Sequence, residues 1–313
     1  MTATARVVTW NRAGAVELRS GNTTAIVVPE LGMLIASFVV DGVEFVARPG
    51  GLAAYRAGHT TAIPLLYPWA NRLSRRSYRA GGTEVSLRGH ALHTDGNGLP
   101  IHGTMTARPD WEVVAMARGR VRARFDFGAH PELLESFPFA HTLEITVSVA
   151  SGRLRIVTSV HASGGCEVPV SFGWHPYWRV PGGRDSWNVE FPDVAHLQLD
   201  RRGLPTGRAQ PEARHAIVLA GQEFDDLYAF AGPGRSVTLT GARRRLRLDF
   251  DAGYPYLQVF APGDGRFCCV EPMTARTNAL VTGDHPVVPA GAAFSATFSA
   301  TVTQPLVTQP PAA

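Results

Sequence analysis

Apolar and polar residues alternate with a period of two along much of the chain. The alternation is clearest in three stretches, residues 120–127, 143–149 and 294–302. Successive side chains of a β-strand point to opposite faces, so each stretch predicts a strand with one buried face, as in antiparallel sheets. Further upstream, Asp41-Gly42 separates two β-rich runs, which is a strong signal for a β-hairpin.

Helical periodicity is nearly absent, and the one short helix that the sequence predicts lies near residues 131–135. Instead, 32 glycines and 23 prolines punctuate many short strands. We therefore expect an all-β fold, a large antiparallel structure of packed sheets with very little helix. No repeat of fixed period and no linker interrupts the pattern, which favours a single domain over residues 1–303. Residues 304–313 are rich in proline and predict a frayed C-terminal tail.

The composition is that of a globular protein with a sizeable core, since 45% of the 313 residues are hydrophobic and 18% are charged. All 30 basic residues are arginine, which excludes chemistry that needs a lysine amine, such as Schiff-base catalysis. The net charge of +4 is small and the arginines are spread along the chain. The dense group at residues 243–247 leads into alternating apolar residues, so we interpret it as the solvated face of a strand. We predict no nucleic-acid partner.

The three cysteines, Cys166, Cys268 and Cys269, predict no disulfide framework, because their number is odd and adjacent cysteines rarely bridge. No Cys-x-x-Cys or mixed Cys/His spacing of a metal site occurs. The first residues contain no hydrophobic segment of signal-peptide length, and no run of about 18 apolar residues could span a membrane. We therefore expect a cytoplasmic protein that does not associate with membranes.

The densest group of chemistry-bearing residues is segment 172–178, which reads Phe-Gly-Trp-His-Pro-Tyr-Trp. Pro176 disfavours helical conformations at His175, so the imidazole lies on an extended or turning segment. Gly173 allows a close approach of the backbone, and Trp174 and its aromatic neighbours offer flat apolar faces with one polar edge each. Such faces suit a sugar, which has C–H faces to stack and hydroxyls to hydrogen-bond. The alternative is a core corner in which His175 is a hydrogen-bonded structural histidine.

Polar side chains stand out in five further segments. Asn71 and Arg72 end an apolar run and carry donors for hydroxyl oxygens, and His102 lies in a Pro-Ile-His-Gly sequence. Glu271 follows the apolar run 268–270, where a charge calls for a reason. Each segment also has a structural interpretation. Arg72 would be a surface ion-pair partner and Glu271 a loop charge, whereas Asp225 would be a turn residue and Gln258 a solvated strand position. The remaining candidates are paired carboxylates in a predicted loop and an amide on a predicted strand: Asp225, Asp226 and Gln258.

Seven landmarks follow one another in an order that resembles the aldose 1-epimerase (galactose mutarotase) family. They are Ala-Asn-Arg at 70–72, Pro-Ile-His-Gly at 100–103, Phe-Pro-Phe-Ala-His at 137–141, Gly-Trp-His-Pro-Tyr at 173–177, Phe-Asp-Asp at 224–226, Leu-Gln-Val at 257–259 and Val-Glu-Pro-Met-Thr at 270–274. The resemblance covers about residues 20 to 300. It implies a β-supersandwich fold with an open carbohydrate cleft, and an isomerase that needs no cofactor and no metal.

By position in these motifs, the resemblance implies that Glu271 is the general base and His175 the general acid that interconvert the α and β anomers of a hexose. His102 would assist at the ring oxygen or orient the sugar. Trp174 is the aromatic residue that we expect against the sugar. The residues that would hold hydroxyls are Asn71, Arg72, Gln258 and Asp225, with Asp226 as the alternative to Asp225.

The sequence departs from many family members at residues 67–69, which read Tyr-Pro-Trp, and at Trp178. Both departures fall where the sugar should bind, so the preferred aldose stays open. One alternative is a hexose-6-phosphate 1-epimerase in which Arg75 and Arg76 bind the phosphate. The others are a non-catalytic carbohydrate-binding or sensing protein and a glycoside hydrolase that uses two carboxylates. The expected partner is a small-molecule sugar, and the expected assembly is a monomer or a homodimer.

Overall fold

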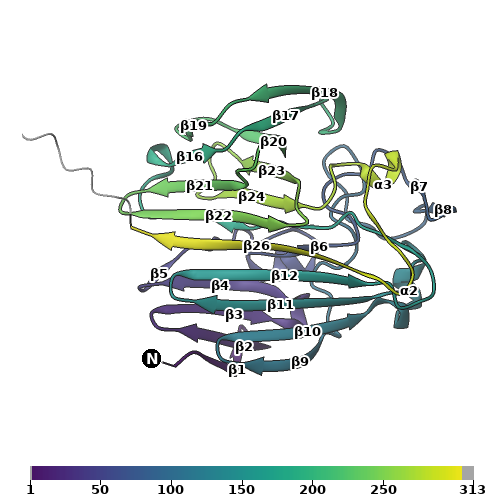
Figure 1. Ribbon diagram of the computed structural model, residues 1–313, viewed down its shortest axis with the longest axis horizontal. Helices are drawn as coiled ribbons and strands as arrows, with labels where there is room; N and C mark the ends of the chain where they lie inside the picture. Colours follow the sequence, from purple (N-terminus) through teal and green to yellow (C-terminus); the bar gives the residue numbers. More distant parts are fainter. Residues whose placement is uncertain (1, 305–313) are drawn as a thin grey trace, which may run out of the picture.

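The structure is a computed structural model that describes residues 2–304, and it is built mainly of antiparallel sheets (Figure 1). The three period-two stretches of the sequence form the long strands β10 (Arg120–Asp126), β11 (Thr142–Ala150) and β26 (Ala293–Thr303). The Asp-Gly turn joins β4 (Leu34–Val40) to β5 (Val43–Glu44) in an antiparallel hairpin. The predicted all-β fold and its hairpin are therefore confirmed.

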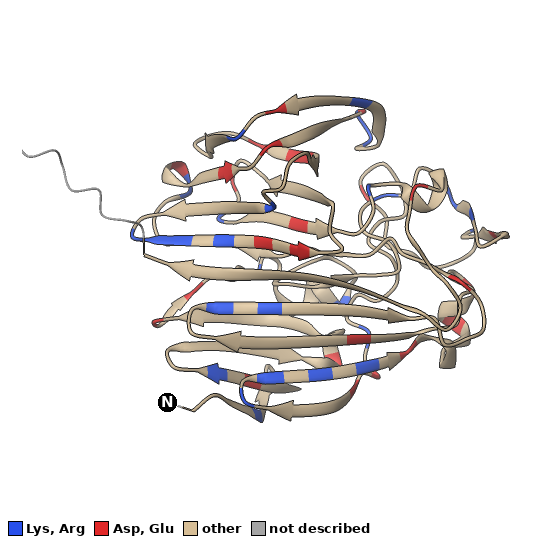
Figure 2. Cartoon of the chain, viewed as in Figure 1, with Lys and Arg blue, Asp and Glu red and all other residues tan. Residues whose placement is uncertain are grey.

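The largest sheet has nine strands in the order β19-β16-β21-β22-β26-β12-β11-β10-β9. On β22 (Arg244–Ala252), Leu246 and Leu248 are buried, whereas Arg245 and Arg247 lie on the opposite face and form ion pairs. Figure 2 shows the charged positions of this strand and of its neighbours. The interpretation as a solvated strand face therefore holds for Arg245 and Arg247. Arg243 lies in the turn before β22, and Arg244 shares the face of Leu246 and pairs with Asp41 at 3.1 Å. The other strands of this sheet are β9 (Glu112–Ala117), β12 (Arg153–His161), β16 (Asn188–Phe191), β19 (His215–Val218) and β21 (Ser236–Gly241).

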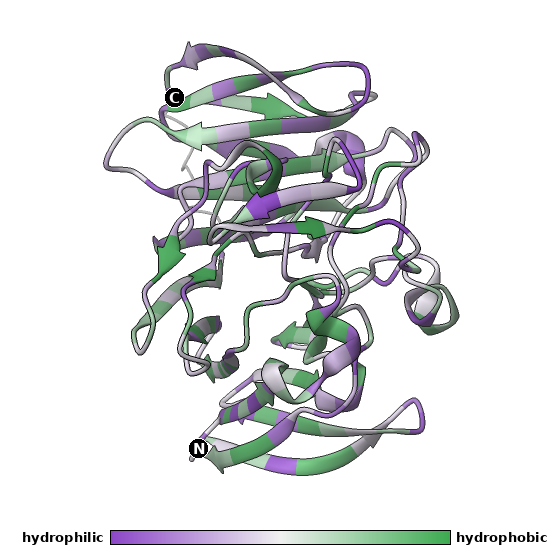
Figure 3. Cartoon of the chain, turned by 90° about the vertical axis from the view of Figure 1, so that its right-hand side faces the viewer, coloured by the Kyte–Doolittle hydropathy of each residue, from purple (hydrophilic) through white to green (hydrophobic). Residues whose placement is uncertain are grey.

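A five-stranded sheet, in the order β1-β2-β3-β4-β5, packs behind β10 and β11 (Figure 1). Apolar residues alternate with polar ones along the strands (Figure 3). The apolar side chains of the two sheets join one hydrophobic cluster that reaches from Ala13 to Val302, so segments from both ends of the described chain share a core. The strands of the smaller sheet not yet given are β1 (Thr4–Trp10), β2 (Ala13–Ser20) and β3 (Thr23–Val28).

A third sheet has eight strands and carries four of the eight predicted site residues, Trp174, Asp225, Gln258 and Glu271. Its order is β18-β17-β20-β23-β24-β14-β6, and β15 pairs with β24 beside this path. The β17–β18 hairpin forms one edge of the sheet, seen at the top of Figure 1. Its strands are β6 (Leu65–Leu66), β14 (Gly173–Trp174), β15 (Tyr177–Trp178), β17 (Val194–Leu199), β18 (Pro205–Glu212), β20 (Phe224–Phe230), β23 (Tyr256–Ala261) and β24 (Cys268–Met273).

Helices are few and short. The predicted helix is present as α2 (Pro131–Leu134), while α1 (Gly51–Arg56) and α3 (Ala279–Thr282) are too short to show helical periodicity in the sequence. Within residues 2–304, no helix has the length and apolar character that a membrane span requires. The remaining elements are the 3₁₀ turns η1 (Pro29–Leu31), η2 (Phe127–Ala129) and η3 (Arg184–Ser186), and two small sheets made by β7 (Ser77–Ala80) with β8 (Thr83–Ser86) and by β13 (Val168–Pro169) with β25 (Val287–Val288).

Three further predictions concern the cysteines, the paired aspartates and the C-terminal tail. All three cysteines are free, as their number and spacing predict. The placement of Asp225 and Asp226 in a loop is wrong, because both lie on β20, which pairs with β23 along both residues. Strand β26 ends at Thr303, and residues 305–313 of the predicted tail lie outside the described residues.

Candidate active site

Seven of the eight predicted site residues line one pocket, which has a volume of about 200 Å³. The pocket combines ionisable side chains, an amide and aromatic rings, the groups that we expect around a sugar. The predicted residues in its lining are Asn71, Arg72, His102, His175, Asp225, Gln258 and Glu271, and the other lining residues are Thr60, Ile101, Tyr177 and Phe260.

Three neighbouring strands of the eight-stranded sheet present polar side chains to this pocket. Gln258 on β23 lies opposite Glu271 on β24. Asp225 on β20 lies opposite Phe260, two positions along β23 from Gln258. Because side chains alternate between the faces of a strand, this register brings Asp225, Gln258 and Glu271 to one face of the sheet.

Two loops complete the pocket with residues in left-handed backbone conformations. Asn71 has a φ of 59° and His102 a φ of 64°, and the backbone N–H of His102 donates to the carbonyl oxygen of Asn71 at 3.1 Å. Asparagine and histidine tolerate this region better than most residues. The next residue, Gly103, must be glycine, because a Cβ there would lie 2.0 Å from the carbonyl oxygen of Tyr67. The Pro-Ile-His-Gly motif thus fixes the loop that carries His102.

His175 and Glu271 form a buried pair. Nε2 of His175 lies 3.2 Å from Oε1 of Glu271, and the side chains are only 7% and 2% exposed. Burial lowers the pKa of His175 from 6.5 to about 3. Burial also raises the pKa of Glu271 well above its usual value, with a further contribution from Asp225 and against the opposing effect of Arg72. Both shifts favour an uncharged pair, in which Glu271 holds the proton and lies beside Nε2 of a neutral His175.

The roles that the sequence motifs imply, a general base and a general acid, call instead for a carboxylate and a charged histidine. The physical reason for the difference is the burial of both groups, which penalises an ion pair more than an uncharged pair. The two arrangements differ only in which of the two groups holds one proton. The pair therefore contains one acid and one base in either arrangement.

Several buried polar atoms of the lining residues have no hydrogen-bond partner within the described part of the chain. They are Oε2 of Glu271, Oε1 of Gln258, and Nδ1 of both His102 and His175. Native proteins rarely leave such atoms unpaired. Four polar groups of the lining residues thus have hydrogen-bonding capacity that the described chain leaves unused.

Two carboxylates and an amide oxygen hold the guanidinium group of Arg72 by hydrogen bonds. Its Nε donates to Asp95 at 2.8 Å, its Nη1 to Asn71 at 3.2 Å and its Nη2 to Asp225 at 3.2 Å. Although burial opposes the shift, hydrogen bonds from the Leu99 backbone and from Arg72 lower the pKa of Asp95. Asp95 is therefore a carboxylate that fixes Arg72 in its place beside the pocket.

The choice between Asp225 and Asp226 follows from their position on β20. Asp225 lines the pocket and accepts a hydrogen bond from Nε2 of Gln258 at 2.7 Å. Asp226 points to the other face of the sheet, where its Oδ1 lies 3.1 Å from Nε2 of His196. Asp225 is thus the carboxylate that is available to a ligand in this pocket.

The placement of Trp174 against the sugar is not supported. Its side chain is fully buried in the core, and its Nε1 donates to Oγ1 of Thr158 on β12 at 3.1 Å. Trp174 and His175 are consecutive in an extended segment, so their side chains point to opposite sides. Since His175 faces the pocket, Trp174 faces the core.

Sequence reasoning missed three lining residues, Thr60, Ile101 and Phe260, and Asp95, which holds Arg72. Tyr177 was among the aromatic residues considered, and its ring stacks on His175 with a centroid distance of 4.7 Å. Its hydroxyl group is 2.6 Å from Oγ1 of Thr60. No signal in the sequence distinguishes Thr60 from other threonines, and Asp95 reads as an ordinary turn residue before Gly96.

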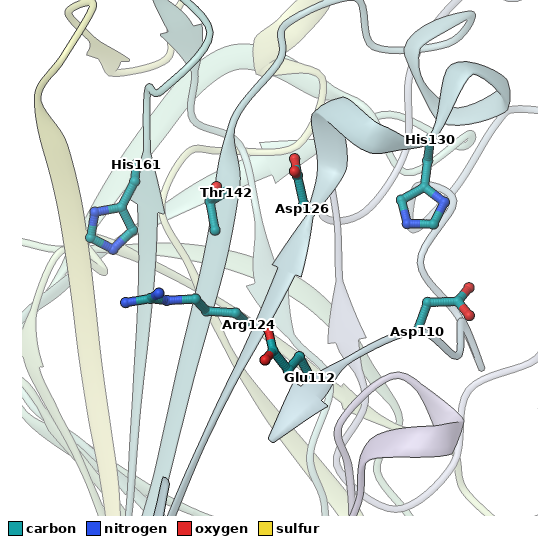
Figure 4. A pocket seen from close by; sticks show the side chains of 7 residues that line it. All are labelled: Asp110, Glu112, Arg124, Asp126, His130, Thr142 and His161. Carbon is teal, nitrogen blue, oxygen red and sulfur yellow. The ribbon is translucent and has the colours of Figure 1, made fainter. Parts of the chain in front are cut away.

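Larger hollows lie elsewhere on the molecule. One of about 480 Å³ lies on the nine-stranded sheet. Its lining consists of three acidic residues, Asp110, Glu112 and Asp126, together with Arg124, Thr142, His130 and His161 (Figure 4). Figure 4 shows Arg124, Thr142 and His161 on strands and Asp110 and His130 on the segments beside them, without a common point on which the side chains converge. His130 is already stacked on Phe125 at 4.6 Å, and the carboxylates of this hollow are exposed. It lacks a buried acid–base pair, so the smaller pocket is the better candidate for catalysis.

Comparisons with known proteins agree with the architecture. The chain resembles the crystal structure of a galactose mutarotase-like protein from Clostridium acetobutylicum, with a TM-score of 0.84, 19% identity, and coverage of 97% of this chain and 99% of the other. It also resembles galactose 1-epimerase from Lactobacillus acidophilus (TM-score 0.77, 13% identity, coverage 97% and 99%). A third similar structure is the GalM/aldose epimerase homologue from C. elegans (TM-score 0.77, 15% identity, coverage 96% and 99%).

These similarities confirm the galactose mutarotase-like fold that the sequence motifs implied. No curated protein matches the sequence. The family model for aldose 1-epimerase matches residues 14–295, which is nearly the whole described chain. The protein therefore belongs to the aldose 1-epimerase family.

Proposed function

We propose that the protein is an aldose 1-epimerase that interconverts the α and β anomers of an unphosphorylated hexose, with Glu271 as general base and His175 as general acid. The observation that carries the proposal is their buried contact of 3.2 Å in a pocket lined by groups that bind hydroxyls. Proton transfer to and from a sugar needs one acid and one base within hydrogen-bond reach of the reacting oxygens. The pair supplies both.

The reaction removes the proton of the C1 hydroxyl group and supplies one to the ring oxygen, so that the ring opens to the aldehyde. Transfer of a proton from Glu271 to His175 across their 3.2 Å contact gives the carboxylate and the imidazolium. Glu271 then accepts the C1 hydroxyl proton, while His175 donates a proton to the ring oxygen. After rotation about the C1–C2 bond the roles reverse and the ring closes, which leaves the carboxylate and the imidazolium again. Return of the proton from His175 to Glu271 restores the starting state. Such proton transfer typically accelerates a reaction by about 10²–10⁴-fold.

His102 is the third member of the proposed catalytic group. Its ring lies edge-to-face with that of His175 at a centroid distance of 5.4 Å. Burial, together with His175 and Arg72, lowers the pKa of His102 well below its usual value. A neutral His102 can donate one hydrogen bond without adding a second positive charge, which suits a role in orienting the sugar or its ring oxygen.

The charges around the pocket favour a neutral sugar over a sugar phosphate. Arg72 is the only arginine in the described lining, and its charge is balanced by Asp95 and Asp225. Arg75 and Arg76, which the phosphate alternative requires, are not among the lining residues. A phosphate dianion would therefore enter a pocket whose cation is already paired and whose other ionisable groups are carboxyl groups and neutral histidines.

The proposal is tested by following the optical rotation of freshly dissolved α-D-glucose and α-D-galactose, each with and without the protein. We expect acceleration with at least one of the two sugars and weak inhibition by glucose 6-phosphate. Sugar binding in a calorimetric titration without any acceleration would make the protein a carbohydrate-binding protein. Acceleration with the phosphorylated sugar alone would support the hexose-6-phosphate alternative.

A further inference from the structure

The turn at the tip of the β17–β18 hairpin, residues 200–204, lies directly against the guanidinium group of Arg72. Gly203 has a φ of +72°, and a Cβ built on it would lie 2.7 Å from Nη1 and 2.8 Å from Cζ of Arg72. Both distances are well inside van der Waals contact. The main chain of Gly203 therefore packs on Arg72 in a space that no other residue type can share without moving the guanidinium group.

The turn holds this position through its own hydrogen bonds. Oδ1 of Asp200 accepts from the backbone N–H groups of Arg202 at 2.8 Å and Leu204 at 3.0 Å. The N–H of Gly203 donates to the carbonyl oxygen of Asp200 at 2.9 Å. Leu204 is buried, which anchors the end of the turn. The turn is thus ordered without help from Arg72 and forms a fixed surface against it.

Part of the guanidinium group is also held by hydrogen bonds. Three of its N–H groups donate to Asp95, Asn71 and Asp225. The other N–H groups are left for a ligand in the pocket, because a guanidinium has more donors than these three bonds use. Hydrogen bonds from a planar group depend on the orientation of its plane. A contact that fixes this plane therefore also fixes the direction of the free donors.

We propose that Gly203 is a positioning residue for sugar binding, which sets the plane of Arg72 so that its free N–H groups point at the hydroxyls of the sugar. The inference rests on the proposed function, since it assigns Arg72 to the sugar. Gly203 takes no part in the proton transfers of Glu271 and His175. Its replacement is therefore expected to change KM and not kcat.

The test is Gly203→Ala, with Gly207→Ala as the matched control on the same hairpin. Gly207 has a similar φ of +84°, and no heavy atom of the described chain, its chain neighbours aside, lies within 4 Å of a Cβ built there. Both variants carry the strain of alanine in the left-handed region, so we expect similar falls in melting temperature. Gly203→Ala should raise KM about tenfold, the effect of a misplaced charged donor, with kcat changed less than about twofold. Gly207→Ala should leave both constants as in the wild type.

Two further measurements separate the position of Arg72 from the function of the protein. In the Arg72→Ala background, Gly203→Ala should have no further effect on KM, because the residue through which it acts is missing. The Nε–Hε resonance of Arg72 in an NMR spectrum should shift in Gly203→Ala and stay in place in Gly207→Ala. An unmoved resonance, or an equal rise of KM with and without Arg72, would overturn the proposal. If the wild type accelerates no aldose, the proposed function fails, and the NMR comparison still decides the role of Gly203.

Discussion

The substitution Glu271→Gln tests whether the buried carboxyl group is protonated in the folded protein. Glutamine has nearly the same shape but cannot ionise. Glu271 is 1% exposed, and burial raises its pKa well above the usual value. The folded protein therefore keeps a proton on Glu271 at pH values where the unfolded chain has lost it.

The size of the effect follows from proton linkage. A carboxyl group with a raised pKa in the folded state contributes most to stability at low pH, and that contribution is lost as the pH rises above the unfolded pKa. The loss is about 1.4 kcal/mol for each pH unit between the unfolded and the folded pKa. The glutamine variant has no ionisable group at position 271, so its free energy of unfolding does not fall for this reason. Between the unfolded and the folded pKa of Glu271, the free energy of unfolding of the variant should therefore rise relative to that of the wild type by about 1.4 kcal/mol per pH unit.

Urea unfolding of both proteins at pH 5, 6 and 7 measures this difference. The titration of His175 contributes equally to both proteins if the substitution leaves its surroundings unchanged, so it cancels in the comparison. Glu223→Gln, at an exposed position before β20, removes a carboxyl group without burial and should show no such trend. A difference between wild type and Glu271→Gln that stays constant from pH 5 to pH 7 would refute the neutral pair and indicate a carboxylate paired with a charged His175.

Three other predictions concern activity and the faces of the strands. Because burial lowers the pKa of His175 to about 3 and raises that of Glu271, kcat should be flat from about pH 5 to pH 7, and a fall centred near 6.5 would contradict the shifts. Asp225→Asn should raise KM about tenfold while Asp226→Asn changes it less than about twofold, and equal effects would contradict the assignment of faces on β20. Trp174→Phe loses one buried hydrogen bond and should lower the free energy of unfolding by about 1 kcal/mol with KM unchanged. A raised KM would indicate that Trp174 contacts the sugar.

The sequence predicted most of the fold because alternation is a local property. A strand such as β10 shows its buried face in every second residue. Glu271 was recognisable for a related reason, since a charged residue directly after an apolar run requires a partner or a role. The motifs around Asn71, His102 and His175 supplied the order of the site along the chain, and the structure places these residues in one pocket.

What the sequence did not predict depends on register and on contacts between distant segments. The choice between Asp225 and Asp226 needs the pairing of β20 with β23, and the burial of Trp174 needs the direction of one short strand. The contact of Gly203 with Arg72 joins residues 131 positions apart. No local pattern reports such a contact, because a glycine in a turn looks the same whether or not a side chain lies above it.

The optical rotation of freshly dissolved α-D-galactose, followed with wild-type protein and with Glu271→Gln, tests the central claim most directly. We predict that the wild type accelerates mutarotation, and that the folded variant is slower by about 10²–10⁴-fold because it has lost the group that exchanges protons with C1. The same pair of proteins is then compared on α-D-glucose, in case galactose is not the preferred sugar. A folded Glu271→Gln variant with turnover near that of the wild type would contradict the account.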